Sequence, residues 1–227
     1  MPRYIVHLSA AEALEQVVIA RDRGKNVSPR RPQYLYLTLE EHLDQPGIDG
    51  LRHICSPPLR TKGTGDSLWQ GLRTDDLSVV STDHCPFCDS EKLLGIDDFR
   101  DTPNGLGSIE HRMDLLHQGV VTGEISLSRW VDVCSTTPAR LFGLQGKKGT
   151  ISPGADADIV IYDHRHPDTV RRRKSHGCGQ LGLAGHRRAR PGGVCDESRH
   201  VCDPQPTLRW PAGHGRYLTR QISDVLR

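Results

Sequence analysis

The chain has 227 residues, of which 35% are hydrophobic, and a mean hydropathy of −0.52. It is therefore long enough for one domain with a sizeable core, and polar enough to leave part of the chain outside that core. The formal net charge of +2 argues against a strong overall attraction to nucleic acid or to a membrane surface. No segment approaches the roughly 20 apolar residues of a membrane span, and the first residues lack the pattern of a signal peptide. We therefore expect a cytoplasmic protein whose seven cysteines are thiols.

Strand-like and helix-like patterns alternate along the first two thirds of the chain. Short apolar or β-branched runs predict strands at residues 4–9, 33–38, 53–59 and 77–84, and one more after a Pro-Gly turn within 149–163. Apolar residues at helical spacing predict helices at residues 10–24, 39–45, 65–73, 108–121 and 126–144. Strands that alternate with helices in this way favour parallel βαβ units, so the expected fold class is α/β.

Polar side chains close several of the predicted strands. In VVSTDHCPF (79–87), a buried run ends at Asp83, and His7 and Ser56 lie near the ends of two other strands. In (β/α)-barrel enzymes the carboxyl ends of the strands form the mouth of the barrel, where the chemistry takes place. Taken singly, each residue has an ordinary alternative: a core position for His7, a turn for Ser56 and a helix N-cap for Asp83.

Eight motifs in order carry a resemblance to a known family. They are VHLSAAEAL (6–14), RPQYLYL (31–37), ICSPPLR (54–60), LWQGLR (68–73), STDHCPF (81–87), PNGLGSIEHRM (103–113), STTPARLFGL (135–144) and KGTISPGADADIVIYD (148–163). Together they resemble the C-terminal half of the D-hydantoinase/dihydropyrimidinase family of cyclic amidohydrolases. The resemblance implies the C-terminal part of a (β/α)8 TIM barrel and part of a small β-sandwich domain.

The resemblance also implies a reaction and a set of site residues. The family opens cyclic amide rings, such as hydantoin or dihydropyrimidine, with two divalent metals that are usually zinc. His7 matches a metal ligand, and Asp83 matches a metal ligand that is also the catalytic general base. Ser56 and Asn104 match positions whose backbone groups bind the small-molecule substrate. Asn104-Gly105 alone predicts only a turn, and its substrate-binding role is implied only by the family resemblance. The resemblance also implies a tetramer for the full-length protein, because the family is usually tetrameric.

The family's other metal ligands, which include a His-x-His pair and a carboxylated lysine, would precede residue 1. We therefore expect a fragment with weak or absent activity of its own. Two alternatives remain open: a non-enzymatic dihydropyrimidinase-like scaffold and an allantoinase-type ring hydrolase. The expected organisation is a half-barrel over residues 1–145, a strand of the small β-domain over 146–170, an aberrant segment over 171–205 and a C-terminal tail over 206–227.

The segment 171–205 does not resemble the family, although similarity resumes at GHGRYL (213–218). It is rich in Arg, Gly, His and Cys, and it contains no aromatic residue and no periodic apolar face. We interpret it as disordered or as the product of a shifted reading frame. The competing interpretation is a basic segment that binds nucleic acid or phosphate. The lack of interleaved aromatic residues favours the first, so nucleic acid is not an expected partner.

Overall fold

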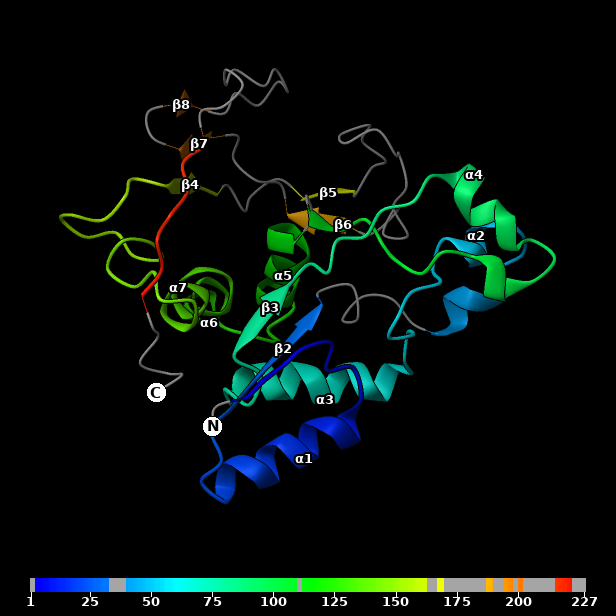
Figure 1. The fold of residues 1–227 in the computed structure, drawn as a ribbon, viewed down its shortest axis with the longest axis horizontal. Coiled ribbons are helices and arrows are strands. Elements are labelled where there is room, and N and C mark those ends of the chain that lie inside the picture. The colour runs from blue at the N-terminus through cyan, green and yellow to red at the C-terminus, as the bar shows by residue number, and fades with distance from the viewer. Residues whose placement is uncertain are drawn as a thin grey trace.

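The computed structural model describes residues 3–32, 40–109, 112–162 and 215–221, and the backbone of four short strands between residues 167 and 201 (Figure 1). The strand predicted at residues 33–38 lies outside these ranges. The aberrant segment also lies outside them, apart from the backbone of its short strands.

The first part of the chain contains β1 (Arg3–Ile5), α1 (Ala11–Asp22), β2 (Val27–Pro32), η2 (Glu40–Asp44), α2 (Ile48–Leu51), α3 (Lys62–Arg73) and β3 (Val79–Ser81). The second part contains α4 (Asp89–Lys92), η3 (Leu93–Gly95), η4 (Phe99–Asp101), α5 (Arg112–Val121), α6 (Leu127–Val131), the π-helical η6 (Asp132–Thr136) and α7 (Thr137–Leu141). The remaining strands are β4 (Ile159–Ile161), β5 (Pro167–Thr169), β6 (Arg187–Ala189), β7 (Val194–Glu197) and β8 (His200–Val201).

A parallel sheet of order β1-β2-β3 forms the centre of the fold. Tyr4 pairs with Ser28 and Arg31 pairs with Val80, so the three strands run side by side in chain order. The helices α1 and α3 contact each other alongside this sheet (Figure 1). The βαβ units that the sequence predicts are therefore present. Within the residues that the structure describes, the sheet stays open and does not close into a barrel.

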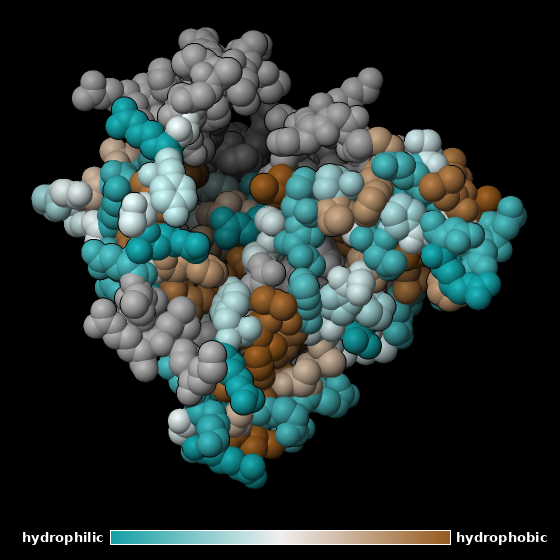
Figure 2. Space-filling view, in the orientation of Figure 1, coloured by the Kyte–Doolittle hydropathy of each residue, from teal (hydrophilic) through white to brown (hydrophobic). Residues whose placement is uncertain are grey.

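The open sheet leaves apolar surface in contact with solvent. Among the described strands, β1 pairs only with β2, so its other edge has no neighbour. Ile5 and Val6 at this strand are 36% and 42% exposed, and Figure 2 shows apolar atoms on the surface over the sheet. In a folded domain, an exposed apolar edge strand is normally paired with another strand or covered by a helix or loop.

The remaining strands form small antiparallel sheets. β4 pairs with β7, which pairs with β8, and β5 pairs with β6. The strand predicted within residues 149–163 is therefore present as β4, whereas the expected β-sandwich remains a prediction. The described C-terminal residues 215–221 return beside α7, where the Gln221 backbone N–H donates to the Gly143 carbonyl at 3.0 Å (Figure 1).

The strand predicted at residues 53–59 is wrong. Turns occupy its start, because His53 and Ile54 donate back to the carbonyls of Gly50 and Leu51, and the Ser56–Pro57 peptide is cis. The two consecutive prolines lack the N–H groups that a sheet ladder needs, which explains why apolar composition alone gave the wrong prediction.

The helix predicted at residues 126–144 is interrupted by the π-helical turn η6. Pro138 has no N–H to donate to the Cys134 carbonyl four residues earlier. Arg112 donates its Nη1 to that carbonyl instead, at 3.3 Å, and to the Val80 carbonyl of β3 at the same distance. Arg112 therefore connects this helical region to β3, the strand that precedes Asp83.

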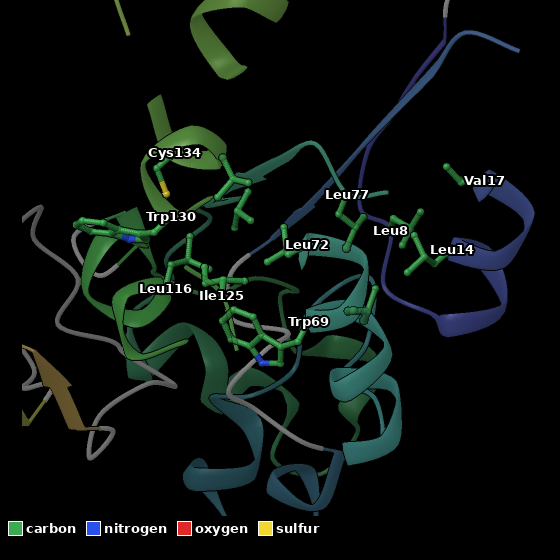
Figure 3. Close-up of a cluster of buried hydrophobic side chains, with 13 residues drawn as sticks. Leu8, Leu14, Val17, Trp69, Leu72, Leu77, Leu116, Ile125, Trp130 and Cys134 are labelled. Atoms are coloured by element: carbon green, nitrogen blue, oxygen red, sulfur yellow. The ribbon is translucent and has the colours of Figure 1, made fainter. Parts of the chain in front are cut away.

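The hydrophobic core lies between the sheet and the helices α1, α3, α5 and α6. Leu14 and Val17 of α1 and Leu68 and Leu72 of α3 repeat at helical spacing and are buried. Figure 3 shows these side chains continuing toward Trp69, Leu116 and Trp130. The helices 10–24 and 65–73 are therefore confirmed, because their periodic apolar faces pack on one another.

The cysteines differ in their chemical state. Cys55, Cys85 and Cys134 are free thiols, as expected. Burial raises the pKa of the Cys134 thiol to about 11, which keeps it protonated and unreactive. Cys88 is disulfide-bonded, so the expectation of a thiol is wrong there.

Candidate active site

Two side chains that the sequence singled out meet beyond the ends of two strands. His7 follows β1 by two residues, and Asp83 follows β3 by two residues. Because β1 and β3 are both parallel to β2, their carboxyl ends lie at the same edge of the sheet. His7 Nε2 and Asp83 Oδ1 are 3.2 Å apart. The structure therefore brings together an imidazole and a carboxylate that are 76 residues apart in the chain.

The backbone is unusual at both positions. Among the described residues other than glycine, a positive φ occurs only at His7 (56°), Asp75 (64°) and Asp83 (48°). The left-handed conformation costs an L-residue about 1 kcal/mol or more, and such residues cluster at functional sites. Asp75 forms an ion pair with Arg129, whereas His7 and Asp83 contact each other. The turn after each strand places both side chains at the sheet edge.

The segment at residues 106–109 holds the loop around Asp83 in place. Ser108 Oγ donates to the Thr82 carbonyl at 2.7 Å, and the Ser108 N–H donates to His84 Nδ1 at 2.9 Å. The Cys85 N–H donates to the Leu106 carbonyl at 3.1 Å. Hydrogen bonds to Thr82 and His84 therefore hold the residues on both sides of Asp83 in place.

His84 has a structural role in this arrangement. Its Nδ1 accepts the backbone N–H groups of Ser108 and Ile109. Only an unprotonated nitrogen accepts, so the neutral ring carries its proton on Nε2. Ser108 is 1% exposed, and sequence analysis missed it because its partners are more than 20 residues away.

Ser56 and Asn104 lie on two exposed loops that touch through their backbones. The Gly105 N–H donates to the Ile54 carbonyl at 3.1 Å, which joins the loop of Asn104 to the loop of Ser56. A Cβ on Gly105 would lie 2.4 Å from the Cys85 carbonyl oxygen, so the position requires glycine. This close approach places the Asn104 loop directly against the Asp83 loop.

His7 and Asp83 fit part of a divalent metal site. Zinc takes imidazole nitrogen and carboxylate oxygen, and two ligands of a tetrahedral zinc are about 3.4 Å apart. The 3.2 Å between His7 Nε2 and Asp83 Oδ1 is close to this distance, and the side chains remain 41% and 28% exposed. No group of three or more His, Cys, Asp or Glu side chains that could hold a metal occurs in the described ranges. His7 and Asp83 could therefore supply two of the ligands of a divalent metal site.

Comparison with known proteins identifies the family. The profile of the amidohydrolase family matches residues 4–184, which is most of the chain. The chain belongs to the amidohydrolase family. The match extends into the segment 171–205, which the motifs had placed outside the family. The amidohydrolase resemblance that the motifs predicted is therefore confirmed.

Relatives within the family are hydantoinases. The chain is 52% identical over 177 residues to a D-hydantoinase of Streptomyces coelicolor, covering 77% of this chain and 38% of the relative. It is 44% identical over 178 residues to a D-phenylhydantoinase of Escherichia coli, covering 77% of this chain and 38% of the relative. This amidohydrolase chain therefore spans less than half the length of these relatives.

Solved structures agree on the fold. The D-hydantoinase (dihydropyrimidinase) from Thermus sp. superposes with a TM-score of 0.91 at 35% identity, covering 98% of this chain and 49% of that one. The dihydropyrimidinase from Brevibacillus agri superposes with a TM-score of 0.83 at 37% identity, covering 86% and 43%. The α/β fold class of this amidohydrolase chain is thus confirmed. No helix in the part of the chain that the structure describes is long and apolar enough to cross a membrane.

Proposed function

We propose that this chain carries the C-terminal share of a metal-dependent hydrolase that opens cyclic amide rings, with hydantoin or dihydropyrimidine as the substrate class. The observation that carries the proposal is the 3.2 Å approach of His7 to Asp83 at the carboxyl edge of a parallel sheet. The 52% identity to a D-hydantoinase supports the same substrate class.

His7 and Asp83 would hold the metal, most simply zinc. When bound, zinc lowers the pKa of a bound water and polarises a carbonyl group. Asp83 accepts a proton from the attacking water and delivers it to the ring nitrogen as the C–N bond breaks. The water oxygen becomes part of a carboxylic acid, which releases its remaining proton to solvent, and the ring nitrogen leaves as a neutral N–H group. His7 Nε2 and Asp83 Oδ1 already lie 3.2 Å apart, so both atoms would bind the same ion, and His7 would exchange its contact with Asp83 for the metal.

The loops of Ser56 and Asn104 bind the ring amide in this proposal. Backbone N–H and C=O groups on two exposed loops can pair with the C=O and N–H groups of a cyclic amide. The Gly105 contacts place these loops against the Asp83 loop, so the ring lies within reach of the carboxylate. Substrate binding therefore depends on the spacing of the two loops.

Two ligands cannot complete a metal site that needs four or more. Further ligands would come from outside the described residues, and we expect weak or absent ring opening by the chain alone. We further propose the division into a half-barrel (1–145), a β-domain strand (146–170), an aberrant segment (171–205) and a tail (206–227). A tetramer of the full-length protein remains part of the proposal.

The first experiment measures metal and activity together. The chain is titrated with Co²⁺ as a spectroscopic probe, alone and after co-expression with the N-terminal part of the Streptomyces coelicolor relative. We expect His7→Ala and Asp83→Asn to abolish Co²⁺ binding and ring opening, while His42→Ala and Asp98→Asn, outside the site, leave both unchanged. A co-expressed complex that binds no metal would instead support the non-enzymatic scaffold. A complex that opens allantoin but not hydantoin or dihydrouracil would support the allantoinase alternative.

A further inference from the structure

A buried lysine lies between the two proposed substrate loops. Lys92, the last residue of α4, is 0% exposed. Its Nζ donates to the carbonyls of Ile54 and Pro103, each at 2.7 Å. These distances are typical of charge-assisted hydrogen bonds, which are stronger than neutral ones. A fully buried lysine is rare unless its charge has partners, so the two carbonyls account for its position.

Both carbonyls belong to the loops that carry the proposed substrate groups. Ile54 precedes Ser56 by two residues, and Pro103 immediately precedes Asn104. The Ile54 carbonyl also accepts the Gly105 N–H. The ammonium group of Lys92 therefore joins the two loops at the point where they approach each other.

The surroundings of the ammonium are mostly apolar. Burial lowers the pKa of Lys92 to about 8, and the Cys55 and Cys85 sulfurs oppose this effect. The ring of Phe87 lies 5.6 Å from Nζ, within cation–π range. The charged side chains of the neighbouring elements pair with one another: Arg52 with Asp49 and Asp89, and Arg100 with Asp98, while Glu91 accepts the Cys88 N–H.

We propose that Lys92 is a positioning residue that sets the spacing between the Ser56 and Asn104 loops and thereby the binding of the cyclic amide. The inference rests on the proposed function of these two loops. Lys92 does not touch the ring itself. Without its ammonium group, two carbonyl oxygens would face each other in a buried space with one N–H between them, and the loops would move apart to reach water.

A measurement on the unmodified chain tests the link between Lys92 and the loops. The carbonyl ¹³C shifts of Ile54 and Pro103 are followed by NMR from pH 6.5 to 9.5, with the Gln70 carbonyl of α3 as the control. We expect the first two to titrate together with a midpoint near 8. They should also titrate together in Cys85→Ser, with a lower midpoint, because the Cys85 sulfur raises the pKa of Lys92. Carbonyl shifts that stay constant over this range would overturn the inference.

A second experiment tests the effect on ligand binding. Dihydrouracil, which stays neutral over this pH range, is titrated into the chain and the dissociation constant is measured by NMR. We expect Lys92→Met to weaken binding about tenfold, the effect of one lost charge-assisted hydrogen bond. Lys92→Arg should recover part of the loss, and Lys147→Met, at an exposed lysine, should bind like the unmodified chain. Co²⁺ binding at His7 and Asp83 in the co-expressed complex should be unaffected by Lys92→Met.

The outcomes separate the two proposals. Binding by the unmodified chain that is unchanged in Lys92→Met would refute the role of Lys92 and leave the substrate assignment standing. No binding by the unmodified chain or by the co-expressed complex would refute the substrate assignment, whatever the carbonyl titration shows. If Lys92→Met does not fold, the pH dependence of dihydrouracil binding to the unmodified chain decides. Affinity should then fall as the pH passes 8, and a constant affinity would refute the inference.

Discussion

Gly119 of α5 permits a close contact between α5 and Trp69 of α3. A Cβ at this position would lie 2.4 Å and 2.6 Å from two ring carbons of Trp69, which is 7% exposed in α3. Gly119→Ala would gain about 1 kcal/mol of helix propensity. The overlap, however, forces Trp69 or the helix to move, which costs about 1–3 kcal/mol and occasionally more. Because both contacts lie well below any observed Cβ distance, we expect a net loss of about 1–2 kcal/mol.

Gly65 of α3 provides the matched control. It is also helical, and a Cβ there would meet nothing within 4 Å, so Gly65→Ala should stabilise by about 0.5–1 kcal/mol. Urea unfolding followed by tryptophan fluorescence and by circular dichroism gives both values, and adding Trp69→Leu should relieve part of the Gly119→Ala loss. If Gly119→Ala is as stabilising as Gly65→Ala, α3 and α5 do not pack as closely as described here.

Three other changes probe the contact of Ser108 with the Asp83 loop, the buried guanidinium of Arg129 and the buried lysine. Ser108→Ala removes the hydrogen bond to Thr82, and we expect a loss of about 1–2 kcal/mol in urea unfolding, with weaker Co²⁺ binding by the co-expressed complex. Arg129→Met leaves buried carbonyls without their donor, and its Tm should fall by an amount equivalent to about 3 kcal/mol. Lys92 has its pKa lowered from 10.5 to about 8, so the unfolded chain binds more protons between these values and stability should rise with pH there, by up to about 3 kcal/mol. Lys92→Met should abolish this rise, and a rise of the same size in the variant would assign it to another group.

The parts of the fold that the sequence predicts are those determined by local periodicity. The faces of α1 and α3 follow from apolar residues three and four positions apart. The strands predicted at 4–9 and 77–84 are present as β1 and β3, although they end earlier than predicted, at Ile5 and Ser81. The approach of His7 to Asp83 was expected only from the family resemblance together with the parallel sheet. The helix faces and the strands thus depend on short stretches of chain, whereas the approach of His7 to Asp83 joins residues 76 positions apart.

The features that sequence analysis missed depend on contacts between distant residues. Lys92 looks like an ordinary surface lysine until Ile54 and Pro103 are brought to it from 38 and 11 residues away. Ser108 looks like a loop residue until it meets Thr82, 26 residues earlier. Pro138 cannot donate to the Cys134 carbonyl, and Arg112, 22 residues earlier in the chain, donates to this carbonyl.

The uncovered edge of β1 has a consequence for how this polypeptide behaves outside a complete enzyme. No described strand pairs with its outer edge, and this edge, next to exposed Ile5 and Val6, can accept a strand from another chain. A second copy and a complementing polypeptide therefore compete for the same edge. Association of copies grows with concentration, so the material recovered from a cell would depend on which strand arrives first, and dilution or early co-synthesis of the complementing strand would favour the correct pairing.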